Sequence, residues 1–240
     1  MKVSKLKENV LLVGFPSNGL VGTFSISYIV HYLGMKQIGE IDHPDLPPTL
    51  FVENGEILAP IRIYKKDNIF VIMSDLPFDP YRAYDFSESI LQYCKSNDIK
   101  KIIIVSGMET INRDPNTPQI YGLTTHQSLE EILYDNQIPK FLAGSIFGTD
   151  AAIITVFRKS KIPALILYAE CHPFFPDPDA SILAITTLAK ILNVKVDTTD
   201  IKKRMERLRI QHRNLMDETI KALQQQKQDK TPTRTPQIYR

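Results

Sequence analysis

The chain has 240 residues, with 29 basic and 27 acidic side chains and 43% hydrophobic residues, an ordinary globular composition. This length suits one sizeable domain, and the apolar content is enough for a buried core, so general disorder is excluded. No apolar run reaches the ~18 residues that a membrane-spanning helix needs, and none of signal-peptide length follows the N-terminal residues. We therefore expect a soluble cytoplasmic protein without a membrane partner.

Charge is distributed unevenly along the chain. Residues 1–199 hold 18 basic and 22 acidic side chains, whereas residues 200–240 hold 11 and 5. A basic terminal segment is compatible with nucleic acid, a membrane surface or an acidic protein partner. Proteins that bind single strands stack bases on aromatic side chains, and none occurs between Phe175 and Pro236. We therefore expect no nucleic-acid partner.

The first part of the chain predicts a strand, a glycine turn and a helix. The apolar run Val10 to Gly14 is typical of a buried strand. A turn, Phe15 to Asn18, follows it, and the apolar spacing after Gly19 predicts a helix that ends at Gly34. Shorter strands are expected at Gln37 to Ile41, Ile57 to Tyr64 and Ile69 to Met73, two of them paired as a hairpin.

Helices and strands alternate through the rest of the first 198 residues. A helix is expected after Pro80, a buried strand at Lys101 to Gly107 and a surface loop at Asn112 to Pro118. Further helices are predicted at Leu129 to Tyr134, Ala151 to Arg158 and Ala180 to Leu192, and further strands at Phe141 to Ile146 and Ala164 to Tyr168. This alternation predicts an α/β sandwich with a mainly parallel central sheet.

The C-terminal segment differs in character from this core. Residues 199–226 are predicted to form one helix, since Ile201 to Gln226 lacks glycine and proline. Its apolar residues at seven-residue spacing suit either a helix packed on its own domain or an oligomer-forming arm. Residues 227–240 are predicted to be a flexible tail, because Lys227 to Gln237 has no aliphatic or aromatic residue. The core domain is then residues 1–198.

The glycine turn lacks the spacing of known phosphate-binding motifs. Gly14 and Gly19 are five residues apart, as in a P-loop, but Leu20 and Val21 stand where lysine and serine or threonine are required. Gly14, Gly19 and Gly22 also miss the dinucleotide-binding pattern. We predict that Gly19 and Gly22 serve a tight turn and close packing of the helix on the sheet.

The segment Glu170 to Asp179 holds the densest group of side chains with catalytic potential. Its prolines and phenylalanines suit a rigid contact loop, and Asp177 or Asp179 is expected to cap the helix from Ala180, with Pro178 in its first turn. Cys171, next to His172, is expected to be a reduced buried thiol like Cys94, the alternative being a nucleophile.

No other set of residues has a spacing that selects a catalytic or metal site. Glu109, Asp75 and Asp79 follow strand candidates and have the chemistry of acid or base groups. The five histidines, His31, His43, His126, His172 and His212, show no metal-ligand spacing. We therefore predict no metal, no cofactor and no catalytic residue.

Three segments together resemble a known family. They are Gly14 to Gly22 (GFPSNGLVG), Leu46 to Pro48 (LPP) and Phe175 to Ala180 (FPDPDA). The chain resembles, over about residues 8–195, the archaeal members of the proteasome assembly chaperone family, relatives of the second eukaryotic assembly chaperone. The resemblance implies a three-layer α/β/α sandwich of the nucleoside-phosphorylase kind without known catalysis. The loop Gly144 to Gly148 has fewer glycines than expected for the family, so no ligand role is assigned to it.

The resemblance also gives a meaning to the last three residues. Ile238, Tyr239 and Arg240 fit the hydrophobic residue, tyrosine and any residue with which proteasome activators end. In the family, such tails enter pockets between α subunits of the core proteasome, where the terminal carboxylate meets a lysine. We therefore expect a homo-oligomeric chaperone or ATP-independent activator that binds the α-subunit ring through several tails. The alternatives are a phosphorylase-like or hydrolase-like enzyme that uses the Gly14 to Gly22 turn, and an oligomeric scaffold with an inert tail.

Overall fold

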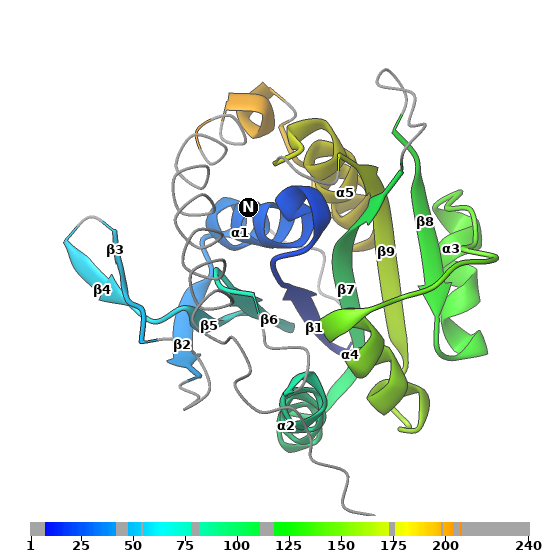
Figure 1. The fold of residues 1–240 in the computed structure, drawn as a ribbon, viewed down its shortest axis with the longest axis horizontal. Coiled ribbons are helices and arrows are strands. Elements are labelled where there is room, and N and C mark those ends of the chain that lie inside the picture. The colour runs from blue at the N-terminus through cyan, green and yellow to red at the C-terminus, as the bar shows by residue number, and fades with distance from the viewer. Residues whose placement is uncertain are drawn as a thin grey trace, which may run out of the picture.

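The protein is a seven-stranded sheet between two layers of helices (Figure 1). The computed structural model describes residues 8–41, 48–53, 55–77, 82–110, 118–172, 176–197, 199–203 and 207. The sheet has the order β2-β5-β6-β1-β7-β9-β8, and a separate hairpin is formed by β3 and β4. The strands are β1 Asn9–Gly14, β2 Lys36–Glu40, β3 Phe51–Glu53, β4 Glu56–Leu58, β5 Ile61–Lys66, β6 Ile69–Ser74, β7 Ile99–Glu109, β8 Ile120–Thr124 and β9 Ala164–Cys171.

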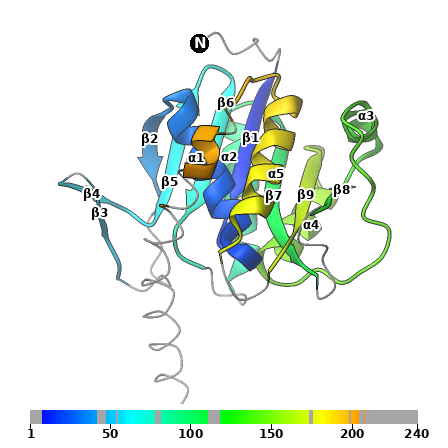
Figure 2. The same ribbon diagram turned by 90° about the horizontal axis from the view of Figure 1, so that it is seen from above.

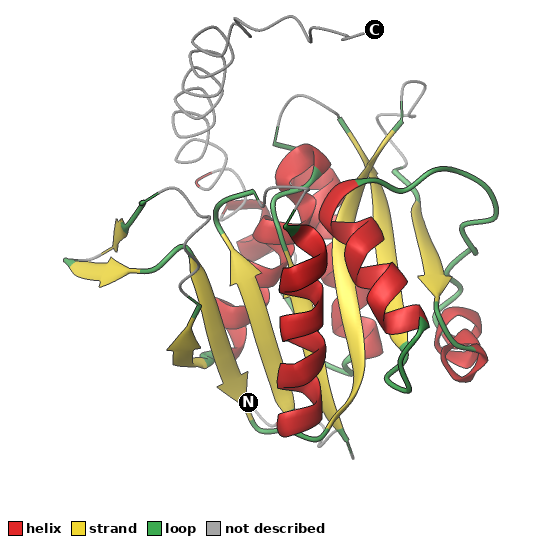
Figure 3. Ribbon diagram, turned by 60° about the horizontal axis from the view of Figure 1, so that its bottom comes forward, coloured by secondary structure: helices red, strands yellow, loops and turns green. Residues whose placement is uncertain are grey.

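Helices cover both faces of the sheet, as Figure 3 shows. They are α1 Val21–Leu33, α2 Ala83–Ser96, α3 Glu130–Asp135, α4 Gly148–Arg158 and α5 Pro178–Ile191. Side chains of α1 and α5 share one hydrophobic core with the sheet, and side chains of α2 and α4 share the other. The predicted α/β sandwich is therefore confirmed.

The central position of β1 in the sheet explains why its sequence is an uninterrupted apolar run. Val10 and Leu12 belong to the core under α1 and α5, while Leu11 and Val13 belong to the core under α2 and α4. All four side chains are buried. A strand that is covered on both faces has no polar side to alternate with, so its sequence is apolar throughout.

The sheet is parallel only in its middle. Strands β6, β1, β7 and β9 run parallel to one another. The outer strands β5, β2 and β8 are antiparallel to their neighbours. Strands β5 and β6 form the predicted hairpin, which turns at Asp67 and Asn68. The predicted parallel sheet thus describes the centre, and the edges are a difference from it.

The strand predicted at Phe141 to Ile146 is wrong. This segment is a loop that leads into α4, and the pairing next to it is limited to an isolated bridge between Lys140 and Gly122. Leu142 and Phe147 are 89% and 81% exposed. The segment's neighbour in the sheet is the edge strand β8, which the periodicity did not indicate and with which this stretch forms only that bridge.

The predicted strand Ile57 to Tyr64 is divided in two. Its first residues form β4, which pairs with β3, and β5 begins only at Ile61. The β3–β4 hairpin, called the arm below, projects from the body beyond β2 (Figures 1 and 2).

The C-terminal helix starts against the core. Residues 199–203 and 207 are helical, and Ile201 is fully buried in the core under α1 and α5. This first turn therefore packs on its own domain. The remainder of the predicted helix 199–226, the predicted tail 227–240 and most of the predicted loop Asn112 to Pro118 lie outside the described residues. No helix in the described ranges combines the length and hydropathy needed to cross a membrane.

Candidate functional site

The glycine turn lies where the central parallel strands end, the usual place for ligand sites in such sheets. The backbone N–H of Gly107, near the end of β7, donates a hydrogen bond of 3.1 Å to Ser17 Oγ. A Cβ at Gly107 would lie 2.0 Å from the carbonyl oxygen of Asn18. A Cβ at Gly22 would lie 2.6 Å from the carbonyl oxygens of Phe15 and Val105. The glycines thus let the turn and α1 approach the strands closely, which confirms the predicted packing role.

Gly19 closes the turn from the other side. Its φ of 64° is in the left-handed region, and a Cβ there would lie 2.8 Å from Cys171 Cβ and 3.1 Å from Asp177 Cβ. Gly19 and Leu20 are both buried. A phosphate site needs backbone N–H groups open to the ligand at the start of a helix, so this covered turn favours packing over phosphate binding.

Asp177 joins the start of α5 to this turn. Its Oδ1 accepts a hydrogen bond of 3.0 Å from the N–H of Ala180, and its Oδ2 accepts one of 2.9 Å from the N–H of His172. Pro178 occupies the first helical position. Asp177 is therefore the predicted N-cap, whereas Asp179 is exposed in the first turn. Residues 173–175 of the predicted contact loop lie outside the described residues.

Both cysteines are buried, and neither forms a disulfide bond in the described part of the chain. Burial raises the pKa of the Cys94 thiol to about 12, which removes the thiolate at neutral pH. Cys171 has 0% exposure and contacts the space beside Gly19 and Gly107, so it fills the junction of turn and sheet. Both cysteines therefore lie in the buried environment that was expected for them.

Two of the three predicted acid or base candidates, Asp75 and Glu109, lie in the described part of the chain, at the ends of different strands. Asp75 forms a buried ion pair with Arg62, whose Nη2 lies 2.5 Å from Asp75 Oδ2. Glu109 is the last residue of β7, and Asp79, His43 and His212 lie outside the described residues. In the part of the chain that the structure describes, no three His, Cys, Asp or Glu side chains form a group able to hold a metal ion.

A polar cluster, formed by the buried Ser106 and Tyr168 and the half-buried Asp150, was not predicted. Ser106 on β7 and Tyr168 on β9 are register partners, so they share a face, and Asp150 lies in the first turn of α4. Neither hydroxyl makes a hydrogen bond of ordinary geometry within the described residues. Both interact with the Asp150 carboxyl: burial raises the pKa of Asp150, and the two hydroxyls partly oppose this effect. Burial, followed by the charge of Asp150, also raises the pKa of Tyr168.

This cluster can hold a proton inside the core under α2 and α4. A carboxyl group with a raised pKa stays neutral to higher pH and can then donate as well as accept hydrogen bonds. Its three residues come from separate segments and two lie within apolar strands, so no spacing in the sequence links them.

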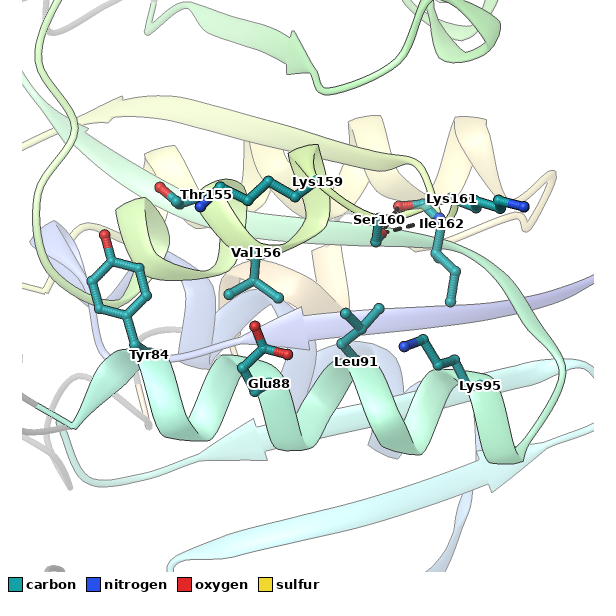
Figure 4. A pocket seen from close by; sticks show the side chains of 10 residues that line it. All are labelled: Tyr84, Glu88, Leu91, Lys95, Thr155, Val156, Lys159, Ser160, Lys161 and Ile162. Atoms are coloured by element: carbon teal, nitrogen blue, oxygen red, sulfur yellow. Dashed lines mark hydrogen bonds between the residues drawn. The ribbon is translucent and has the colours of Figure 1, made fainter.

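A groove of about 580 Å³ runs between α2 and α4 (Figure 4). Leu91, Val156 and Ile162 supply apolar side chains, and Tyr84 lies at one end. Its charged residues are one acid and three bases, namely Glu88, Lys95, Lys159 and Lys161. None of these four forms an ion pair with another described residue. The groove therefore combines an apolar surface with an excess of positive charge.

The predicted partner-binding residues Ile238, Tyr239 and Arg240 lie outside the described residues. Their role stays a prediction. The structure does describe the surface of the core domain, and a partner bound by the tail would also have to fit that surface.

Comparison with known proteins identifies relatives along nearly the whole chain. The uncharacterized protein MJ0106 of Methanocaldococcus jannaschii is 21% identical over 94% of this chain and 92% of its own length. Pyrococcus furiosus PbaA, described as an archaeal homolog of proteasome-assembly chaperone, has a TM-score of 0.83 and 24% identity, covering 92% of this chain and 97% of PbaA. Pyrococcus furiosus PbaB, described as an archaeal proteasome activator, has a TM-score of 0.72 and 16% identity, covering 90% and 97%.

The two structural matches have the same fold as this chain, and together with the family model they confirm the resemblance stated from its three motifs. The family model for the PAC2 family matches residues 11–216. These residues include the glycine turn, the cap of α5 and every strand of the sheet except the beginning of β1. The chain therefore belongs to the PAC2 family.

Proposed function

We propose that the protein is a homo-oligomeric proteasome assembly chaperone or ATP-independent activator that binds the α-subunit ring of the core proteasome. Its membership of the PAC2 family carries this proposal, together with a fold shared with PbaA and PbaB, which are described as a proteasome-assembly chaperone homolog and a proteasome activator. The proposed role is binding and needs no catalysis.

The C-terminal tail is the proposed docking element. Ile238 supplies apolar surface, Tyr239 supplies apolar surface and one hydroxyl, and Arg240 supplies the terminal carboxylate for a cation on the α ring. One such tail would bind weakly. Several tails on one oligomer raise the overall affinity by effective concentration, by about 10² to 10⁴-fold for well-matched linkers.

The experiment compares the intact protein with a variant that lacks Ile238 to Arg240. Binding to purified core proteasome and hydrolysis of a fluorogenic peptide are measured in the same samples. We expect the deletion and Tyr239→Ala to abolish or strongly weaken binding, while Lys230→Ala, elsewhere in the predicted tail, leaves it unchanged. Increased hydrolysis with the intact protein identifies an activator, and binding without increased hydrolysis identifies an assembly factor. Equal binding by intact and deleted protein would contradict docking through the tail.

The enzyme alternative has its own test. A phosphorylase would be stabilised by phosphate, because a ligand that binds only the folded state raises the melting temperature with its concentration. We expect no specific shift with inorganic phosphate, since the turn is buried under Cys171 and Asp177. A saturable shift with phosphate that sulfate does not reproduce would favour the enzyme.

A further inference from the structure

The arm has an apolar face whose side chains are exposed in the part of the chain that the structure describes. Val52 and Ile57 are register partners and are 73% and 69% exposed, and Leu50 before them is 66% exposed. The arm stands away from the helices and the sheet in two perpendicular views (Figures 1 and 2). A two-stranded hairpin is at best marginally stable alone in water, and exposed apolar patches mark interaction surfaces. The arm therefore has the features of an interaction surface.

The α2–α4 groove is a second uncovered surface, and it differs from the arm in shape. It is concave, with a volume of about 580 Å³, and Leu91, Val156 and Ile162 line it (Figure 4). Tyr84, at one end, is 53% exposed. This volume is in the range of protein pockets that enclose several apolar groups. A projecting hairpin with branched aliphatic side chains is a suitable occupant.

The charges of the arm and of the groove are also complementary. Residues 48–58 contain the acids Glu53 and Glu56 and no lysine or arginine. Glu56, on β4, is exposed. The groove has three lysines against one glutamate, and none of them is ion-paired within the described residues. The net negative charge of the arm is therefore complementary to the net positive charge of the groove.

We propose that the arm of one copy docks into the α2–α4 groove of a second copy of this chain. The proposal rests on the homo-oligomeric part of the proposed function and specifies its interface. Val52 and Ile57 pack on the apolar lining, and Glu56 meets the lysines. The arm and the groove are different surfaces, so two copies satisfy the contact either by exchanging arms in a two-fold dimer or by repeating it head-to-tail, which closes a ring when the rotation permits.

The test measures molecular mass by light scattering during size-exclusion chromatography, without proteasome. The arm variant is Val52→Asp with Ile57→Asp, and the groove variant is Lys159→Glu with Lys161→Glu. All four side chains are exposed, so we expect both variants to keep the wild-type circular dichroism. We expect the wild type to be an oligomer and each variant to be a monomer. Leu142→Asp, at an 89% exposed apolar residue in another loop, and Lys190→Glu are the matched controls and should stay oligomeric.

Mixing the two variants tests whether the arm pairs with the groove. The arm variant keeps an intact groove and the groove variant keeps an intact arm, so an equimolar mixture should give heterodimers and nothing larger. Several results would overturn the proposal: a monomeric wild type, an oligomeric groove variant, a mixture that stays monomeric, or a deletion of residues 227–240 that alone yields monomers. If the wild type is an oligomer and the variants are monomers as expected, but the wild type does not bind the proteasome, the proposed function is contradicted and this interface still holds.

Discussion

The backbone N–H of Asp177 donates a hydrogen bond of 2.9 Å to the carbonyl oxygen of Gly19. This bond ties the start of α5 to the turn between β1 and α1, two segments more than 150 residues apart. The two joined segments lie at the ends of the central strands. The place where many α/β proteins hold a ligand is thus used here for packing.

Replacing Asp177 by alanine should lower the free energy of unfolding by about 2 kcal/mol. The variant loses the cap of α5 and leaves the N–H of His172 without its acceptor. Urea unfolding at neutral pH measures the change. Asp179→Ala is the matched control, because this exposed acid faces the helix dipole and has no ion pair with a described residue, so its removal should cost less than about 1 kcal/mol. Equal effects of the two variants would contradict the capping role.

Gly22→Ala should destabilise the fold by about 3 kcal/mol or prevent folding. The added methyl would lie 2.6 Å from two backbone oxygens, and backbone atoms cannot move aside as a flexible side chain can. Gly39→Ala is the control, since the nearest atom to its Cβ would be at 3.8 Å. Melting temperatures of both variants check this, and a Gly22→Ala protein as stable as the wild type would exclude tight packing of α1 on the strands.

Asp75→Ala should lower the free energy of unfolding by about 3 to 5 kcal/mol. The Arg62 side chain is only 7% exposed, and removal of its counterion leaves a buried charge without compensation. The double variant Arg62→Met with Asp75→Leu should recover most of this loss, because an apolar pair of similar size avoids the desolvation cost. If the single and double variants unfold at the same urea concentration, Asp75 acts through something other than the ion pair.

Local sequence signals predicted the parts of the fold that depend on local interactions. The apolar run of β1, the left-handed Gly34 that ends α1 and the Asp177 cap all depend on neighbours in sequence and were predicted. Phe141 to Ile146 was predicted as a strand because its composition is apolar, but its partner depends on which segment occupies the sheet edge. That choice is made by long-range packing.

The candidate sites divide in the same way. The packing role of the glycine turn was predicted from spacing, since Leu20 and Val21 exclude the known phosphate motifs. The pairing of Asp75 with Arg62 and the grouping of Ser106, Tyr168 and Asp150 were missed. The residues of the cluster come from β7, β9 and α4, so only the assembled sheet brings them together.

Stability should depend on pH through Asp150. Burial raises the pKa of this carboxyl in the folded state above the value of about 3.9 in the unfolded chain. Between these two values the folded state binds more protons than the unfolded state, so the free energy of unfolding falls as pH rises. The stability that Asp150 contributes is fully present below its pKa in the unfolded chain. It is lost as the pH rises through its pKa in the folded state.

Asp150→Asn should remove this dependence, because an amide does not ionise. Urea unfolding of the wild type and the variant from pH 4 to pH 8 should give a difference in free energy that shifts in favour of the variant as pH rises. Ser106→Ala removes a hydroxyl that lowers the pKa of Asp150, so its stability should fall more over the same range than that of the wild type. Parallel curves for wild type and Asp150→Asn would mean that this carboxyl titrates alike in the folded and unfolded states, and would contradict its burial as the source of the pH dependence.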